Sequence, residues 1–505
     1  MKPDYDLVII GGGINGAGIA RDAAGRGLKV LLVEAQDLAG ATSSASTKLI
    51  HGGLRYLEYY EFHLVAEALK EREVLLGIAP HLVSPLEFVL PHEPHLRPAW
   101  MIRAGLYLYD HLAKHRKLPN SKGINLSTHA YGQPLLETYK RGFTYADCRV
   151  DDARLVVLNV MDAAERSATI LTRTICSGLR QESGLWQIQL TDIASKRQYV
   201  KHASMVVNAA GPWVRSLLDS SGLVGANTPN VRLVKGSHLI VPRLYGGEQA
   251  YILQQPDRRI IFAIPWQGQF TMVGTTDENF TGDPSQAAIE QAEVDYLCSA
   301  INRSFRQKIG PENIVATWSG VRPLVADGHD KPESVTRDYK LILDRHHGPP
   351  LLSIFGGKIT TYRRLAEEAV NELCGGRAWT GSAPLPGGDI PNGDFNAFLH
   401  AQELRYPWLP EALVSRYAHA YGTRMDSFIG DAKNAEGLGK YFGDGIYEAE
   451  VRYLVAKEWA RTMDDLLWRR SKLRLFVGAD TIKNLERALP RMVREITGLE
   501  KVAGG

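Results

Sequence analysis

Three glycines near the amino terminus are spaced as they are in phosphate-binding loops. Gly11, Gly13 and Gly16 directly follow the apolar residues 7–10. The first glycine permits a tight turn, the second lets the backbone approach a pyrophosphate, and the third lets a helix pack closely on a strand. Glu34 lies 23 residues after Gly11, where its carboxylate can bind an adenosine ribose and would repel a 2′-phosphate. This spacing predicts a site for a dinucleotide that lacks a ribose 2′-phosphate.

The residues around these glycines predict the elements that position them. Residues 7–10 form a short continuous apolar run, typical of a parallel strand that is buried on both faces. Residues 17–26 are rich in Ala and Gly and predict a closely packed helix, with Gly27 at its carboxyl end. Residues 29–33 predict a second strand. The order strand, glycine turn, helix, strand and glutamate indicates a Rossmann-type α/β fold.

A second segment that could do chemistry covers residues 41–57. Its small hydroxylated residues and glycines would let backbone N–H groups approach a pyrophosphate and a flat ring. We assign cofactor contacts here to Thr42, Ser43, Ser44, Lys48, Gly52 and Gly53. His51, Arg55 and Tyr56 add charge and groups that can transfer a proton. A Ser-rich surface loop is the alternative interpretation, which the apolar residues within the segment disfavour.

Small residues also follow two later apolar runs. Ala209 and Gly211 come after the predicted strand at residues 205–207, where they leave room for a cofactor at the carboxyl end of a sheet. Residues 353–362 repeat the order strand, glycines and helix start, and they contain the further cofactor candidates Gly357, Lys358 and Thr360. Residues 363–373 continue as an amphipathic helix. A plain strand and turn is the alternative interpretation of the first of these segments.

These motifs together resemble those of the FAD-dependent, quinone-linked glycerol-3-phosphate dehydrogenases, within the D-amino-acid-oxidase-like flavoprotein superfamily. The matching segments occur in family order, at residues 10–18, 43–56, 207–213, 234–238, 274–277, 319–323 and 355–362. The resemblance implies an α/β fold with a Rossmann-type FAD-binding domain, an antiparallel-sheet substrate domain and a C-terminal helical domain. It implies FAD as the cofactor, and the sequence shows no flavin-linking His or Cys motif, so we expect noncovalent binding.

The resemblance also implies an activity. It predicts oxidation of sn-glycerol 3-phosphate to dihydroxyacetone phosphate by hydride transfer to flavin N5, with the electrons passed to ubiquinone or menaquinone. We assign substrate binding to Arg55, Tyr56, Arg322, Arg337 and Lys358. Arginine suits a phosphate because guanidinium forms bidentate hydrogen bonds and stays charged. His51 or His238 is expected to accept the hydroxyl proton, while Arg55 or Lys358 could stabilise a developing alkoxide.

Three alternatives to this function stay open. The first is an oxidase of the same substrate that reduces oxygen, although its relatives typically carry an internal insertion that this chain lacks. The second is an amino-acid or amine oxidoreductase of the broader superfamily, which would need a site for a carboxylate instead of a phosphate. The third is a flavin-binding sensor without turnover.

The predicted organisation is discontinuous. We expect the FAD-binding domain at residues 1–90, 145–235 and 325–380, and the substrate- and membrane-facing domain at 91–144 and 236–324. A Pro- and Gly-rich stretch at residues 384–391 marks a boundary. Residues 390–505 are then expected to form the helical domain, which is mostly helical by periodicity from residue 395 and includes residues 447–470. A homodimer is possible.

Composition excludes several other classes of protein. The formal net charge of +3 on 505 residues gives no case for nucleic acid. Four scattered cysteines, without a histidine at ligand spacing, predict no disulfide framework and no metal site. The start of the chain lacks the layout of a signal peptide, and no uncharged run is a convincing membrane span, so a cytoplasmic protein without a transmembrane helix is expected.

One segment nevertheless suggests contact with a membrane surface. Residues 98–112 are rich in aromatic and apolar side chains, contain Arg103 and are followed by a basic cluster at residues 114–117. This combination suits an interfacial helix on anionic lipid. A buried helix with a solvated basic end is the alternative. Because the resembling family passes electrons to membrane quinone, we expect peripheral attachment at the cytoplasmic face of the inner membrane.

Overall fold

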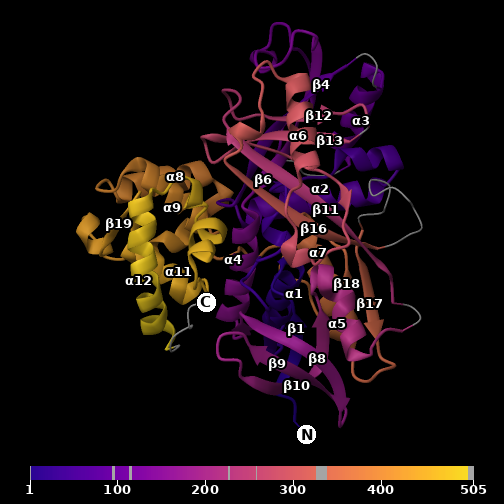
Figure 1. Cartoon of the computed structure of the whole chain (residues 1–505), viewed down its shortest axis with the longest axis vertical. Helices are drawn as coiled ribbons and strands as arrows, with labels where there is room; N and C mark the ends of the chain where they lie inside the picture. The colour runs from indigo at the N-terminus through magenta and orange to yellow at the C-terminus, as the bar shows by residue number, and fades with distance from the viewer. Residues whose placement is uncertain are drawn as a thin grey trace.

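The computed structural model describes residues 2–93, 97–112, 117–225, 228–257, 259–325 and 338–498. Two large sheets lie one above the other along the long axis of the molecule, and a group of helices lies beside them (Figure 1). The amino terminus is at the free end of the first sheet (Figure 1). The predicted fold class, a Rossmann-type α/β domain with a second, largely antiparallel sheet and a C-terminal helical region, is confirmed.

The first sheet has eight strands, of which five are parallel neighbours. Their order is β18 (Leu351–Phe355), β10 (Gln198–Asn208), β1 (Tyr5–Ile10), β2 (Val30–Val33) and β7 (Thr169–Leu171). The antiparallel strands are β17 (Lys340–Asp344), β8 (Thr174–Glu182) and β9 (Leu185–Asp192). In β1, Leu7 and Ile9 pack into one hydrophobic core and Val8 and Ile10 into another. The strand is therefore buried on both faces, as its continuous apolar run predicts.

Helices cover both faces of this sheet. The helices around it are α1 (Ile14–Gly25), α4 (Asp152–Glu165), α5 (Val214–Ser221) and α7 (Tyr362–Cys374). Helix α1 packs against α4 and α7, and its small residues allow the close approach. It ends at Gly25, two residues before Gly27, whose φ of +86° suits a residue without a Cβ. The predicted strand–helix–strand unit is thus confirmed.

The second sheet has ten strands and is almost entirely antiparallel. Its main order is β15 (Glu278–Asn279), β11 (Val231–Pro242), β14 (Phe270–Gly274), β13 (Ile260–Trp266), β12 (Ala250–Gln254), β4 (Val83–His92), β6 (Arg141–Val150) and β3 (Leu49–Ile50). Strand β16 (Ala316–Val325) pairs with β11, and β5 (Lys122–Asn125) pairs with β6. The associated helices are α2 (Phe62–Ile78), α3 (Ala99–His111) and α6 (Gln291–Ser304). The domain limits expected from the sequence stay a prediction.

The C-terminal region consists mainly of helices packed beside α4 (Figure 1). They are α8 (Phe395–Arg405), α9 (Glu411–Tyr421), α10 (Asp426–Ile429), α11 (Glu448–Lys457), a π-helix (Asp465–Arg470) and α12 (Ala479–Thr497), with the short hairpin β19 (Tyr441–Gly443) and β20 (Ile446–Tyr447). One hydrophobic core runs from α1 and α4 into these helices. None of the described helices is long and apolar enough to cross a bilayer.

The helical structure expected over residues 447–470 is interrupted in the middle. Helix α11 ends at Lys457, and the π-helix begins only at Asp465. Trp459 between them has a φ of +57°, which no α-helix contains. Glu458 at the break is fully buried and forms an ion pair with Arg154 of α4. Periodicity alone could not reveal this turn, because the contact that stabilises it involves a residue about 300 positions earlier.

Candidate active site and cofactor cavity

The glycine turn after β1 leaves no room for side chains. A Cβ on Gly11 would lie 2.4 Å from the Ala209 carbonyl oxygen, and Gly11 has a φ of +113°. A Cβ on Gly16 would lie 1.9 Å from the Gly11 carbonyl oxygen. Both contacts are with backbone, which cannot rotate away. These two glycines therefore let α1 begin directly above the ends of β1 and β10.

Glu34 closes the turn at the end of β2. Its carboxylate accepts hydrogen bonds from the backbone N–H of Gly12, at 2.6 Å, and of Gln36, at 2.7 Å. Burial raises the pKa of Glu34 above its usual value, while the two N–H donors act in the opposite direction. The glutamate thus connects the glycine turn to the loop that follows β2.

These elements enclose an elongated cavity of about 560 Å³. Seven of the predicted cofactor residues line it: Gly11, Gly13, Glu34, Thr42, Ser43, Ala209 and Gly211. The cavity lies at the carboxyl ends of β1, β2 and β10, where open parallel sheets bind nucleotides. We call it the adenosine cavity, because the turn, the glutamate and the start of α1 fit the adenosine and pyrophosphate of a dinucleotide.

Two hydroxyl residues connect the adenosine cavity to a second one. Ser43 Oγ accepts a hydrogen bond from the Ile14 N–H at 3.0 Å, and Thr42 Oγ1 donates one to the Val321 carbonyl oxygen at 2.7 Å. Thr42 and Ser43 line both cavities. The second cavity measures about 260 Å³ and lies between the two sheets; we call it the catalytic cavity. Its lining includes the predicted residues His51, Tyr56, His238, Arg322, Gly357, Lys358 and Thr360.

The turn after β18 forms one wall of the catalytic cavity. Gly356 and Gly357 have φ values of +80° and +105°, and Asn15 of α1 donates a hydrogen bond to the Gly356 carbonyl oxygen at 3.0 Å. Lys358 Nζ lies 3.9 Å from the centre of the Tyr56 ring. Thr360 Oγ1 accepts a hydrogen bond from the His51 N–H at 3.2 Å. These contacts join the first and the last of the sequence motifs at one place.

His238 of β11 contributes a neutral imidazole to the same cavity. Its Nε2 lies 3.0 Å from Thr47 Oγ1, and the ring lies beside Trp318. Burial, together with the nearby cations Lys48 and Arg322, lowers the pKa of His238 to about 3. At neutral pH this imidazole is therefore uncharged and can accept a hydrogen bond.

Arg322 of β16 is positioned by an acidic residue. Its Nη2 donates to Asp277 Oδ1 at 2.5 Å and to the Thr276 carbonyl oxygen at 3.2 Å. The guanidinium is partly exposed, whereas Asp277 is nearly buried. An arginine held in this way keeps its orientation and its charge for an anionic ligand. The other predicted phosphate ligand, Arg337, lies outside the described residues.

Several predicted residues lie elsewhere. Lys48 Nζ is buried against Asp152 of α4, at 2.8 Å, and burial lowers the pKa of this lysine. Lys48 and Ser44 line a separate cavity towards the C-terminal helices. Gly52 donates its N–H to the Tyr109 hydroxyl, Gly53 lies beneath the Tyr56 ring, and Arg55 donates to Tyr59. Gly16 lies under the glycine turn. The cofactor and substrate contacts assigned to these residues stay predictions.

Three residues of the site were not assigned from the sequence. They are Asn15, which holds the turn after β18, Thr47, which contacts His238, and Asp277, which positions Arg322. All three lie within the matching motifs, at residues 10–18, 43–56 and 274–277. Their partners could not be found from the sequence, because these lie 341, 191 and 45 positions away.

The adenosine cavity and the catalytic cavity share Thr42 and Ser43 in their linings, and comparison with known families identifies the cofactor. Residues 6–363 match the family described as FAD-dependent oxidoreductase. The chain belongs to the FAD-dependent oxidoreductase family. Residues 378–498 match the family described as the C-terminal domain of alpha-glycerophosphate oxidase. The resemblance inferred from the motifs is confirmed, and FAD is the cofactor of this family.

Individual relatives of this oxidoreductase cover almost its whole length. It is 52% identical to the D-erythritol 1-phosphate dehydrogenase of Brucella abortus (strain 2308), over 92% of this chain and 94% of that protein. It is 51% identical to the aerobic glycerol-3-phosphate dehydrogenase of Escherichia coli (strain K12), over 94% of this chain and 95% of that protein. The glycerol-3-phosphate dehydrogenase from Bacillus halodurans, solved with FAD, superposes with a TM-score of 0.79 at 28% identity, covering 98% and 91% of the two chains.

Proposed function

We propose that this oxidoreductase converts sn-glycerol 3-phosphate to dihydroxyacetone phosphate and passes the electrons to ubiquinone or menaquinone at a membrane surface. The observation that carries the proposal is Arg322, held by Asp277 in the same cavity as the neutral imidazole of His238. A fixed guanidinium suits a phosphate, and an imidazole that is uncharged at neutral pH can accept a hydrogen bond from the substrate hydroxyl. The names of the two relatives at about 50% identity both specify phosphorylated alcohols.

Each residue has a task that follows from its chemistry. Arg322 binds the phosphate, and Arg337 is the second phosphate ligand that the motifs predict. His51 or His238 accepts the proton from the C2 hydroxyl. Lys358 stabilises negative charge on the substrate oxygen, and Tyr56 beneath it limits where its ammonium can lie. FAD, when bound, supplies the acceptor for the hydride that leaves C2.

A direct experiment is to add substrate to the pure yellow protein without oxygen. We expect sn-glycerol 3-phosphate to bleach the flavin absorbance near the rate of turnover. D-erythritol 1-phosphate is the second candidate, because the relative of that name is equally similar. Faster bleaching by D-erythritol 1-phosphate would make it the substrate instead. If neither compound bleaches the flavin, the protein is a flavin-binding sensor or acts on another class of substrate.

The electron acceptor needs its own test. We expect rapid reoxidation of the reduced enzyme by a short-chain ubiquinone or menaquinone analogue and slow reoxidation by air. Hydrogen peroxide formed at the rate of substrate oxidation, without added quinone, would instead identify an oxidase. Because this experiment starts from reduced flavin, it identifies the electron acceptor independently of the substrate.

The proposed membrane contact rests on an aromatic patch, which consists of Tyr59, Tyr60, Phe62, Trp100, Met101, Tyr107 and Leu108. Trp100 is 70% exposed and Tyr107 60% exposed, both on α3. Met101 and Leu108 also lie on α3, Phe62 begins α2, and Tyr59 and Tyr60 lie just before α2. Exposed aromatic side chains gathered on one surface are typical of peripheral membrane proteins. Lys114, His115 and Arg116 of the predicted basic cluster lie outside the described residues. The homodimer stays a prediction.

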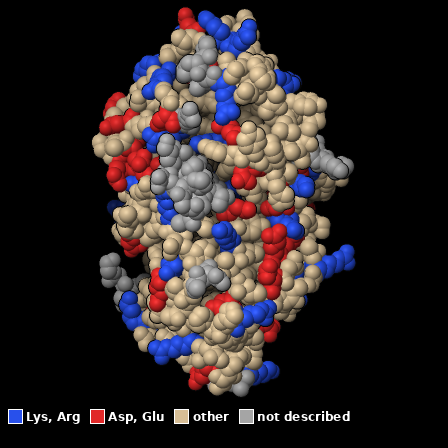
Figure 2. Space-filling view, turned by 90° about the vertical axis from the view of Figure 1, so that its right-hand side faces the viewer, with Lys and Arg blue, Asp and Glu red and all other residues tan. Residues whose placement is uncertain are grey.

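Vesicle pelleting tests this contact. We expect the protein to pellet with vesicles that contain anionic phosphatidylglycerol and the double substitution Trp100→Ser, Tyr107→Ser to release most of it. Tyr441→Ser is the matched control, because Tyr441 is also exposed but lies in the C-terminal hairpin. Equal pelleting of both variants would move the contact elsewhere. On the face drawn in Figure 2, described basic and acidic side chains are interspersed, so charge alone does not mark a binding surface there.

A further inference from the structure

The loop that follows β2 forms one side of the adenosine cavity. Glu34, Ala35, Gln36, Ala39 and Gly40 line the cavity. Within the loop, the Ala39 N–H donates to the Gly12 carbonyl oxygen at 3.1 Å. Glu34 accepts the hydrogen bonds from Gly12 and Gln36 described above. The position of this loop therefore decides where the ribose-binding carboxylate lies.

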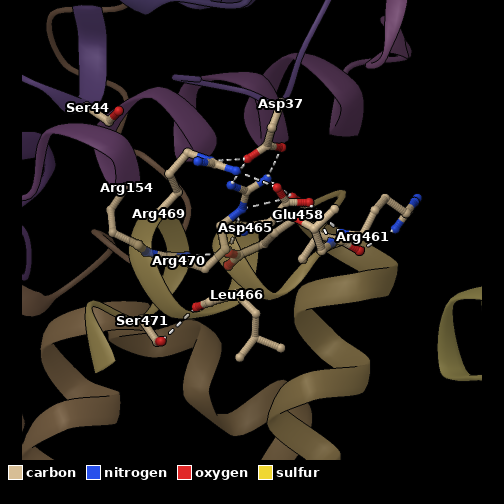
Figure 3. Close-up of polar contacts among 12 residues, drawn as sticks. Asp37, Ser44, Arg154, Glu458, Arg461, Asp465, Leu466, Arg469, Arg470 and Ser471 are labelled. Carbon is tan, nitrogen blue, oxygen red and sulfur yellow. Dashed lines mark hydrogen bonds and ion pairs between the residues drawn. The ribbon is translucent and has the colours of Figure 1, made fainter. Parts of the chain in front are cut away.

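Asp37, in the middle of the loop, points towards the C-terminal helices (Figure 3). Arg470 forms a bidentate pair with it, with Nη1–Oδ2 at 2.7 Å and Nη2–Oδ1 at 2.8 Å. Arg469 Nε contacts the same carboxylate at 2.6 Å. Asp37 is 4% exposed and Arg470 is fully buried. Both arginines belong to the π-helix, more than 430 positions away in the sequence.

The two arginines are themselves held in place. Arg470 donates to the Glu458 carbonyl oxygen from Nε, at 3.0 Å, and from Nη2, at 2.6 Å (Figure 3). Arg469 contacts Asp465, which also accepts a bond from Arg173 at 2.5 Å. The pKa of Asp465 stays well below its usual value: burial alone would raise it, but the surrounding arginines outweigh that effect.

The π-helix is also connected to the loop after β2 through Arg173. The backbone N–H of Arg173 donates to the Gln36 carbonyl oxygen at 2.9 Å, and the next residue, Thr174, donates to the Glu34 carbonyl oxygen at 2.9 Å. The side chain of Arg173 meanwhile pairs with Asp465 of the π-helix. The loop is thus fixed through Asp37 on one side and through the residues at the start of β8 on the other, and both connections end at the π-helix.

We infer that the C-terminal helical region sets how tightly FAD is held by fixing the loop after β2 through the pair of Asp37 and Arg470. Neither residue lines the adenosine cavity, so both are positioning residues. Buried ion pairs impose a specific geometry, and loss of one partner leaves an uncompensated charge that drives local rearrangement. A rearranged loop would displace Glu34 and its two hydrogen bonds.

The test measures FAD release from the holoenzyme. The released FAD is captured by an excess of an unrelated apoflavoprotein, and the variants are Arg470→Met and Asp37→Asn. We expect each variant to release FAD at least about tenfold faster, equivalent to ~1.4 kcal/mol of binding free energy if the association rate is unchanged. With saturating FAD, kcat should equal that of the wild type. Release is measured without substrate or quinone, so a negative result would contradict this inference without contradicting the proposed function.

A matched control separates positioning from general destabilisation. Glu450 is also buried in the C-terminal region and pairs with Arg416, but it lies away from the loop. Glu450→Gln should lower Tm without changing FAD release, and the conservative Arg470→Lys should restore part of the FAD retention. Equal release rates in the Arg470→Met, Asp37→Asn and Glu450→Gln variants would overturn the inference.

Two further measurements cover the remaining outcomes. In the Arg470→Met, Asp37→Asn double variant, FAD release should be no faster than in either single variant, because both substitutions break the same ion pair. Additive effects would show that the two residues act separately. If Arg470→Met does not fold, hydrogen exchange of residues 34–40 in the Asp37→Asn holoenzyme decides: unchanged protection of these amides would also overturn the inference.

Discussion

The adenosine cavity and the catalytic cavity meet at Thr42 and Ser43 but have different walls. Around the adenosine cavity, backbone atoms leave no room for an added side chain, as at Gly11, where a Cβ would lie 2.4 Å from the Ala209 carbonyl oxygen. Around the catalytic cavity, side chains that carry charge or accept protons come from both sheets. Added side-chain volume should therefore impair FAD binding in the first cavity, whereas loss of charge should impair substrate binding and turnover in the second. Each of the following changes tests that difference.

The largest effect is expected at the glycine turn. In Gly16→Ala the new Cβ would lie 1.9 Å from a backbone oxygen, so the turn or α1 must shift. We expect almost complete loss of bound flavin, measured as the ratio of absorbance at 450 nm to that at 280 nm. Gly105→Ala is the control, because its Cβ has no described atom within 4 Å. Full flavin content in Gly16→Ala would show that the turn tolerates volume.

The two histidines should affect rate and leave flavin content unchanged. A general base contributes on the order of 10²–10⁴-fold to a reaction rate. We expect such a loss of kcat for either His51→Asn or His238→Asn, and a smaller loss for the other. Stopped-flow measurement of flavin reduction by substrate compares the two directly. A wild-type rate in both variants would assign the proton to a different group.

Arg322→Gln should act mainly on substrate binding. Hydrogen bonds to charged groups contribute about 1.5–3 kcal/mol, and each ~1.4 kcal/mol corresponds to a factor of ten, so KM should rise roughly 10- to 150-fold. Arg259→Gln is the control, because Arg259 belongs to an exposed charge cluster beside the same sheet. Inorganic sulfate should inhibit the wild type more strongly than Arg322→Gln. An unchanged KM would place the phosphate elsewhere.

The smallest effect concerns pH, and here the two cavities should respond in opposite directions. His238 has a pKa of about 3 in the folded protein, against about 6.5 in an unfolded chain. Its contribution to stability is present above pH 6.5 and is lost as the pH falls towards 3. Between pH 7 and 5 the wild type should lose about 2 kcal/mol more unfolding free energy than His238→Asn.

Glu34 should show the reverse. Burial raises its pKa in the folded protein, so protonation favours the folded state and acidification adds stability. Glu34→Gln should therefore lose more stability between pH 7 and 5 than the wild type does. Urea denaturation of the apoproteins at pH 7 and pH 5 measures the free energy of unfolding of the wild type, His238→Asn and Glu34→Gln. A smaller loss in Glu34→Gln would mean that the carboxylate is better solvated than its burial indicates.

The adenosine cavity could be predicted because its determinants are close together in the sequence. Gly11, Gly13 and Glu34 belong to one strand–helix–strand unit, and local sterics fix their relative positions. The catalytic cavity could be predicted only in part. His238, Arg322 and Lys358 were found as members of motifs, but the buried ion pair between Lys48 and Asp152 was not anticipated. Nothing local to Lys48 distinguishes a cofactor ligand from half of a buried ion pair.

By itself, the sequence determined the Rossmann-type unit, its preference for a dinucleotide without a 2′-phosphate, and, through the motifs, the family. These follow from backbone geometry and hydrophobic periodicity, which act over a few residues. The tertiary structure decided which side chains meet: Asp277 with Arg322, Asn15 with the turn at Gly356, and Asp37 with Arg470. Such pairs depend on the packing of distant segments, because an ion pair forms wherever the fold brings opposite charges together and not where the sequence places them side by side.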